Sequence, residues 1–209
     1  MKKFIAGAVA LALVIVAIYG AYWWFDLRWR PKTITKHQAE ITKIIEQAGW
    51  VSPRLDGPKL YMISFRKCPD CIRFTHEEFP GLHKAGVDTR VIMIARGEYN
   101  GIEKSTPPER ATVAELWINR SWPLLERWDS LPPDAWTAQG IPPADGDIGR
   151  TAVVEAGRGL VKDITPLLKA NGVKFAYPLL IWWTKDGEMK ACACEKRETY
   201  RFVRKELGA

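Results

Sequence analysis

Two cysteines separated by two residues, Cys68 and Cys71, directly follow a short apolar run, and this arrangement limits the possible folds more than any other feature. The run LYMISF at Leu60–Phe65 has the length of a strand and is flanked by turn-forming residues. Residues 72–83 can continue as a helix, and TRVIMIA at Thr89–Ala95 predicts a second buried strand. The pattern therefore predicts a βαβ unit with both cysteines at the N-terminus of its helix.

The remaining sequence predicts several helices and one C-terminal hairpin. Two strands, Tyr177–Thr184 and Glu188–Cys194, surround the turn Lys185–Gly187. Counting outward from this turn sets Leu180 opposite Cys192 and Pro178 opposite Cys194. Helices are expected at 34–48 (ended by Gly49), 109–119, 121–130, 151–156, 160–170 and 195–207. The helix that follows Cys71 is expected to break near Pro80–Gly81. A polar loop is expected at 97–108 and an irregular segment at 132–149.

The N-terminal segment Phe4–Phe25 is apolar and contains no charged residue until Asp26. At about 1.5 Å per residue, a helix of this length spans roughly 30 Å, which is enough to cross a bilayer. Aromatic residues gather at its far end, as in an interfacial belt. The apolar run exceeds that of a typical signal peptide, and no small-x-small cleavage site follows it, so an uncleaved anchor is favoured. The aromatic residues are Tyr19, Tyr22, Trp23, Trp24 and Trp29.

Composition separates a folded domain from this anchor. With 47% hydrophobic and 26% charged residues among 209, the chain can bury a core and is not disordered as a whole. Its formal net charge is +7, but no basic block is interleaved with aromatic residues, so nucleic-acid binding is not expected. We predict an anchor over residues 1–30 and a single domain over 31–209, and the basic residues beside the anchor suit anionic lipid headgroups.

The chemistry of the cysteine pair depends on a thiolate at the start of a helix. The unpaired N–H groups and the positive end of the helix dipole stabilise an anion there. Arg66, Lys67 and Arg73 would add to this stabilisation, whereas an ionised Asp70 would oppose it. Cys68 is expected to attack a substrate disulfide and Cys71, which should be more buried, to resolve the mixed disulfide. The redox-active disulfide would need no further cofactor.

The second pair, Cys192 and Cys194, leaves several interpretations open. Together with Cys68 and Cys71 it could bind zinc, and Cys68–Cys71 could also be a structural disulfide. As an auxiliary redox pair, Cys192 and Cys194 would have to bond to each other. Residues i and i+2 of a strand place their Cβ atoms roughly 6–7 Å apart, whereas a disulfide needs about 3.8 Å, so this bond requires a bend. The plain alternative is two small residues at a strand end. His76 and His83 are expected on a helix face.

The order of elements resembles the thioredoxin-like superfamily, in particular the bacterial Dsb-type periplasmic thiol–disulfide oxidoreductases. The resemblance rests on LYMISFRKCPDC at 60–71, TRVIMIA at 89–95 and YPLLIWWTKDGEMKACAC at 177–194, and covers about 34–209. It implies an α/β fold in which helices flank a central mixed sheet, with a helical insertion at about 97–172.

The resemblance also implies roles for individual residues. Pro178 would be a cis-proline that faces the active-site disulfide, and Tyr177, Pro69 and Asp70 would contact substrate. Cytoplasmic thioredoxins carry a buried acid where this chain has Met62, and a tryptophan where it has Lys67. The redox direction therefore does not follow from the resemblance.

Together these features predict a membrane-anchored, periplasmic thiol–disulfide oxidoreductase. A CxxC domain suggests an oxidising compartment, outside the cytoplasmic membrane. Expected partners are thiol or disulfide proteins of the cell envelope and a membrane or periplasmic redox partner. The segment between anchor and motif is too short for a dimerisation domain, which favours a monomer. The alternatives are a metal-delivery module that uses the four cysteines and a redox-inert scaffold.

Overall fold

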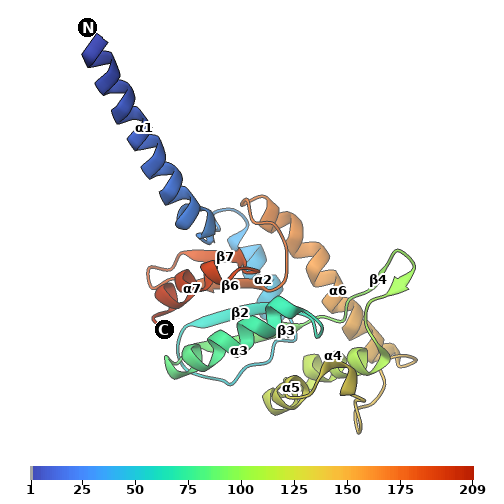
Figure 1. The fold of residues 1–209 in the computed structure, drawn as a ribbon. Coiled ribbons are helices and arrows are strands. Elements are labelled where there is room, and N and C mark those ends of the chain that lie inside the picture. The colour runs from blue at the N-terminus through green and yellow to red at the C-terminus, as the bar shows by residue number, and fades with distance from the viewer. Residues whose placement is uncertain (1) are drawn as a thin grey trace. The chain divides into compact units, whose positions relative to one another are not determined.

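The computed structural model describes residues 2–209, and the chain forms two units, Met1–Pro31 and Lys32–Ala209 (Figure 1). The first unit contains α1 (Lys2–Phe25) and a 3-10 turn, η1 (Leu27–Trp29). Within the described residues, Leu11–Trp29 is the one segment long and apolar enough to cross a membrane, by length and composition.

The second unit is built on a five-stranded mixed sheet in the order β1-β7-β6-β2-β3. Strands β2 and β3 are parallel and joined through α3, whereas β1, β6 and β7 pair antiparallel with their neighbours. The βαβ unit and the mixed sheet expected from the sequence are both confirmed. The strands are β1 (Lys32–Thr33), β2 (Lys59–Ser64), β3 (Asp88–Met93), β6 (Leu179–Trp183) and β7 (Met189–Ala193).

Helices cover both faces of this sheet because side chains alternate along each strand. Leu60 and Met62 of β2 point into one apolar cluster with residues of α3, α4, α5 and α7. Tyr61 and Ile63 point into the opposite cluster with residues of α2 and α6. The helices are α2 (Gln38–Gln47), α3 (Pro69–Lys84), α4 (Pro107–Asn119), α5 (Trp122–Asp129), α6 (Ile148–Lys169) and α7 (Tyr200–Leu207), with short 3-10 turns η2 (Pro133–Ala135) and η3 (Arg197–Thr199).

The C-terminal hairpin has the predicted register. Leu180 pairs with Cys192, and the Cys194 N–H donates to the Pro178 carbonyl over 2.9 Å. The Thr184 N–H bonds the Glu188 carbonyl at the turn, also over 2.9 Å. The CxC pair therefore lies at the end of the sheet where β6 begins.

Three expectations about local structure are wrong. α3 continues through Pro80 without the expected break, because Phe79 and Leu82 are held in the core on either side of it. The two helices expected at 151–156 and 160–170 form one helix, α6, whose buried face runs through both. The polar loop at 97–108 contains a small hairpin of β4 (Glu98–Tyr99) and β5 (Ile102–Glu103).

Candidate thiol–disulfide site

Cys68 and Cys71 form a disulfide across the first turn of α3, with their Cα atoms 5.2 Å apart. Cys68 is the N-cap residue and has extended backbone angles, and its Sγ accepts a hydrogen bond from the Cys71 N–H over 3.1 Å. Pro69 takes the first helical position, where a missing N–H costs nothing. The prediction that both cysteines begin a helix is confirmed.

The disulfide is covered more evenly than the sequence suggested. Cys68 and Cys71 are each 2% exposed, so the expectation that Cys71 is the more buried of the two is wrong. The bond folds the Cys68 side chain back over the first helical turn, beside Cys71. The neighbouring Lys67 and Pro69 are exposed, so the motif itself lies at the surface.

Two of the three cations near Cys68 in sequence are engaged elsewhere. Arg66 turns into the protein, donates to Asp129 Oδ1 over 2.8 Å and to the Leu131 carbonyl, and lies over the Trp128 ring. Its pKa is lowered by burial, against the favourable charge of Asp129. Lys67 pairs with Asp134 over 2.5 Å on the surface. Neither side chain is directed at the disulfide by these contacts.

The third cation, Arg73, neutralises the carboxylate inside the motif. Its Nη2 donates to Asp70 Oδ1 and to the Glu195 carbonyl, both over 2.6 Å, and its Nε approaches the Tyr200 hydroxyl at 3.4 Å. Asp70 is therefore paired within the first turn of α3, where its charge would otherwise oppose a Cys68 thiolate. The sequence left this balance open.

The Tyr177–Pro178 peptide bond is cis, and Pro178 is buried at the start of β6. Ile63 pairs with Leu179, so the end of β2 meets the start of β6, and the Phe65 and Tyr177 rings lie edge to face with centroids 4.9 Å apart. The cis bond expected at Pro178 is present, whereas the position of Pro178 opposite the disulfide stays a prediction. Burial raises the pKa of Tyr177 to about 12, so its phenol is neutral at physiological pH.

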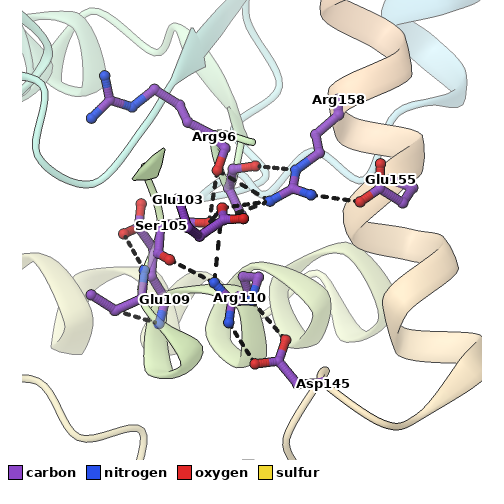
Figure 2. A network of polar contacts seen from close by, with 10 residues as sticks. Arg96, Glu103, Ser105, Glu109, Arg110, Asp145, Glu155 and Arg158 are labelled. Carbon is purple, nitrogen blue, oxygen red and sulfur yellow. Dashed lines mark hydrogen bonds and ion pairs between the residues drawn. The ribbon is translucent and has the colours of Figure 1, made fainter. Parts of the chain in front are cut away.

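Arg96 is a neighbour of the site that the sequence reasoning missed. Its guanidinium lies 3.8 Å from the Phe65 ring centroid, next to Tyr177. Figure 2 shows the side chain pointing away from a polar network that holds its backbone, in which the Arg96 carbonyl accepts from Arg158 and Ser105. A basic residue that directly follows a buried strand was the available signal.

The same network fixes the insertion to the end of β3 (Figure 2). Arg158 of α6 donates to the Ala95 carbonyl over 3.0 Å and pairs with Glu103 of the small hairpin, also at 3.0 Å. Arg110 of α4 pairs with Asp145 through two hydrogen bonds. Because Arg110 also pairs with Glu103 at 3.9 Å, four segments of the insertion are held together: the small hairpin, α4, α6 and the loop at Asp145.

A cavity of about 450 Å³ lies between α3, α5 and the sheet, and Cys71 forms part of its wall. Apolar side chains such as Phe79 and Trp122 line most of it. His76 and His83 also line it, in agreement with their expected place on a helix face. Burial lowers the pKa of His83, whose ring bonds Thr89 over 2.7 Å. No pattern in the sequence indicates this cavity.

Cys192 and Cys194 also form a disulfide, and the strand bends to allow it. Their Cα atoms are 5.2 Å apart, compared with roughly 6.6 Å for alternate residues of an extended strand. The Glu195 N–H donates to the Ala193 carbonyl over 3.0 Å, which closes a three-residue turn centred on Cys194. This is the bend that the sequence required for such a bond. Among residues 2–209, no group of three or more His, Cys, Asp or Glu is arranged to hold a metal ion.

No protein-family model and no curated protein sequence matches the chain. Solved structures do. BcfH from Salmonella enterica Typhimurium is 12% identical with a TM-score of 0.47, and the match covers 100% of this chain and 90% of BcfH. Oxidised BdbD from Bacillus subtilis is 17% identical with a TM-score of 0.42, and the match covers 79% of this chain and 95% of BdbD. MdbA from Corynebacterium diphtheriae, a thiol-disulfide oxidoreductase, is 14% identical with a TM-score of 0.36, and the match covers 71% of this chain and 83% of MdbA. The mixed sheet of this chain, its flanking helices and its CxxC helix themselves form a thioredoxin-like fold with a helical insertion.

Proposed function

We propose that this chain is a membrane-anchored, periplasmic thiol–disulfide oxidoreductase that acts on protein substrates. The observation that carries the proposal is the Cys68–Cys71 disulfide closed across the first turn of α3, with Cys68 as the helix cap. A sulfur at this position accepts the Cys71 N–H and lies at the positive end of the helix dipole. Both effects favour the thiolate that disulfide exchange requires.

In the reducing direction, the Cys68 thiolate attacks one sulfur of a substrate disulfide and releases the other substrate sulfur as a thiolate. Cys71 then loses its proton and attacks Cys68 in the mixed disulfide, so that the Cys68–Cys71 disulfide forms and the second substrate sulfur leaves. Two electrons pass from the cysteine pair to the substrate, and the released thiolates take up the protons. Oxidation is the reverse sequence, and a membrane or periplasmic redox partner resets the pair.

Substrate binding is proposed for the surface beside Cys68. Pro69 and Asp70 border the disulfide, and Tyr177 precedes the cis-proline, Pro178. An extended substrate segment that lies along Pro178 would reach the Tyr177 and Phe65 rings. Aromatic side chains that are partly buried and rigidly packed supply contact area at low entropic cost.

The enzyme is proposed to be tethered through α1, to face the periplasm and to act as a monomer. The apolar length of Leu11–Trp29 supports the tether, and two disulfides within one domain support an oxidising compartment.

The proposal is tested by disulfide exchange with a model protein. The purified full chain should reduce insulin in the presence of dithiothreitol or oxidise a dithiol peptide, and C68S should lose both activities. C71S should accumulate a mixed disulfide between Cys68 and the substrate, because the resolving thiol is missing. The matched control is C68S/C71S, which should trap nothing. A wild-type chain without either activity, or a purified chain carrying stoichiometric zinc or copper on its cysteines, would reject the proposal.

A further inference from the structure

Two consecutive residues at the second disulfide, Cys194 and Glu195, bond to Pro178 and to Arg73 of α3. The Cys194 N–H donates to the Pro178 carbonyl over 2.9 Å, on the proposed substrate side. The next carbonyl along the chain, that of Glu195, accepts from Arg73 over 2.6 Å, on the α3 side. The bend that the Cys192–Cys194 bond holds closed therefore fixes a backbone acceptor on the arginine that also pairs with Asp70.

From this geometry we propose that Cys192 and Cys194 form a second redox couple, whose oxidised state holds the Glu195 carbonyl on Arg73 and thereby sets the thiolate population of Cys68. The inference rests on the proposed function, since it assigns a regulator to the same exchange reaction. Arg73 acts here as a positioning residue, through Asp70.

The chemistry of the second couple needs a dithiol as reductant. A thiolate of the dithiol attacks Cys192 Sγ, which belongs to a residue 7% exposed, and Cys194, which is fully buried, leaves as a thiolate and takes up a proton. The second thiol of the dithiol then displaces Cys192. The dithiol becomes a disulfide, and Cys192 and Cys194 become two thiols, so two electrons and two protons are transferred.

Opening this bond removes the covalent restraint on the turn at Cys194. The chain can then extend toward the spacing of roughly 6.6 Å that alternate strand residues prefer, which withdraws the Glu195 carbonyl from Arg73. The Arg73–Asp70 pair is about one-third exposed on each side, at 30% and 34%, so water competes for it once the carbonyl anchor is lost. A less firmly paired Asp70 disfavours the Cys68 thiolate.

The expected consequence is a change in the redox equilibrium of the first couple. Reduced Cys68 and Cys71 become less stable relative to their disulfide, so the equilibrium constant with glutathione should shift roughly two- to fivefold toward the disulfide. The pH of half-maximal Cys68 alkylation should rise in parallel.

Both couples can be followed separately in the intact protein, because trypsin places them on different peptides. Cleavage after Lys67 and Arg73 releases CPDCIR, and cleavage after Lys190 and Lys196 releases ACACEK. Differential alkylation of the full chain in glutathione and dithiothreitol buffers, followed by mass spectrometry, reports the redox state of each pair. The variants to compare are C192A/C194A, R73Q, R73K, and R73Q combined with C192A/C194A.

The inference expects the Cys68–Cys71 equilibrium to shift in C192A/C194A and R73Q in the same direction, and no further when the two changes are combined. R73K should restore part of the wild-type value. R197Q is the control, because Arg197 also joins α3 to the segment after β7, through Glu77, but leaves the bond between Arg73 and Glu195 in place, so its shift should be clearly smaller than that of R73Q. By reciprocity, R73Q should also change the Cys192–Cys194 equilibrium, which tests the coupling even if C192A/C194A does not fold.

The inference is overturned if Cys192–Cys194 remains a disulfide in dithiothreitol that fully reduces Cys68–Cys71, or if C192A/C194A causes no shift. A shift of equal size in the R73Q background would overturn it too. These failures differ from failure of the proposed function, in which the wild-type chain exchanges no disulfide with insulin or a dithiol peptide.

Discussion

Arg66 carries its charge into the interior two residues before Cys68, where it is only 4% exposed. Its partner Asp129 keeps 36% of its side chain exposed. Water could therefore solvate Asp129, if Arg66 were removed, more easily than it could solvate Arg66 if Asp129 were removed. A buried guanidinium that loses its carboxylate cannot be rehydrated without opening the fold, whereas the carboxylate can turn toward solvent.

We expect this asymmetry to appear in stability. D129A should lower the free energy of unfolding by about 3 kcal/mol, because it leaves Arg66 buried and unpaired. R66M should cost no more than about 1 kcal/mol, because methionine fills much of the apolar space and Asp129, whose pKa is raised by burial, can take up a proton or turn its exposed part toward water. Urea unfolding of the detergent-solubilised chain at neutral pH measures both. Equal losses would show that burial of Arg66 is not the dominant cost.

His83 should give the fold a pH dependence. Burial lowers the pKa of His83 below its ordinary value of 6.5, although the charges of Glu126 and Asp88 act in the opposite direction. At pH values between the folded-state pKa and 6.5, the unfolded chain therefore binds more protons than the folded chain. The free energy of unfolding contributed by His83 is therefore complete above pH 6.5 and is lost as pH falls, with a slope of at most about 1.4 kcal/mol per pH unit. The difference in unfolding free energy between wild type and H83Q, measured from pH 8 to 5, isolates this group. A pH-independent difference would contradict the prediction.

At the residue scale, the sequence predicted the place of a residue in its strand or helix better than the residues that it contacts. Cys68, Pro69 and Cys71 were predictable because local rules decide them: a strand ends, a cap follows and proline fits the first turn. The burial and ion pairing of Arg66 were not predictable, because its partner Asp129 lies 63 positions away in the sequence. Pairing of Arg73 with Asp70 is local, but its bond to Glu195 depends on the return of the C-terminal hairpin.

Helices α3 and α6 show where local signals yield to packing. Both contain a proline, and α6 also contains Gly157 and Gly159, yet each is continuous. Proline in a helix interior costs about 3 kcal/mol or more, which several buried side chains on one face can offset. The hairpin register, in contrast, was fully predictable, because a tight turn fixes every pair beyond it.

Gly49 has a packing role that the sequence did not indicate. It directly follows Ala48, the C-cap of α2, as expected for a residue that ends this helix, and a Cβ on Gly49 would come within 2.5 Å of the Trp117 backbone. Gly159, inside α6, faces open space.

These two glycines should respond oppositely to the same substitution. G49A should destabilise the domain by about 1–3 kcal/mol, because backbone must shift to relieve the contact with Trp117. G159A should stabilise it by about 0.5–1 kcal/mol, because alanine favours the helix and meets nothing. Urea midpoints of the two variants provide the comparison. Stabilisation by G49A would mean that Gly49 and Trp117 of α4 do not approach as closely as described.

At the scale of the whole molecule, the anchor and the domain follow different physical rules. The large apolar side chains of α1 are exposed from Leu11 to Ile18, whereas those of the domain meet in two clusters. Arg28 lies over the Trp24 and Trp29 rings, at 3.8 and 4.1 Å from their centroids. Such amphipathic groups suit the boundary between lipid and water.

We therefore expect the full chain to remain in the membrane pellet after alkaline carbonate extraction. Two arginines within the apolar helix, in L13R/V16R, should release it, because each costs about 2.5–3.5 kcal/mol at the centre of a membrane helix. I148R is the matched control. This variant puts an arginine in the domain at position 148, where the native isoleucine is 90% exposed, and it should leave membrane retention unchanged.

The side of the membrane is tested by the cysteines themselves. After mild reduction of intact cells whose outer membrane admits small solutes, a membrane-impermeant maleimide should label Cys68 on the CPDCIR peptide, because the domain is proposed to face the periplasm. Labelling only after lysis would place the domain in the cytoplasm, where thiols are kept reduced and a tethered disulfide oxidase would have no oxidising partner. Release of I148R would instead show that retention depends on the domain as well as on α1.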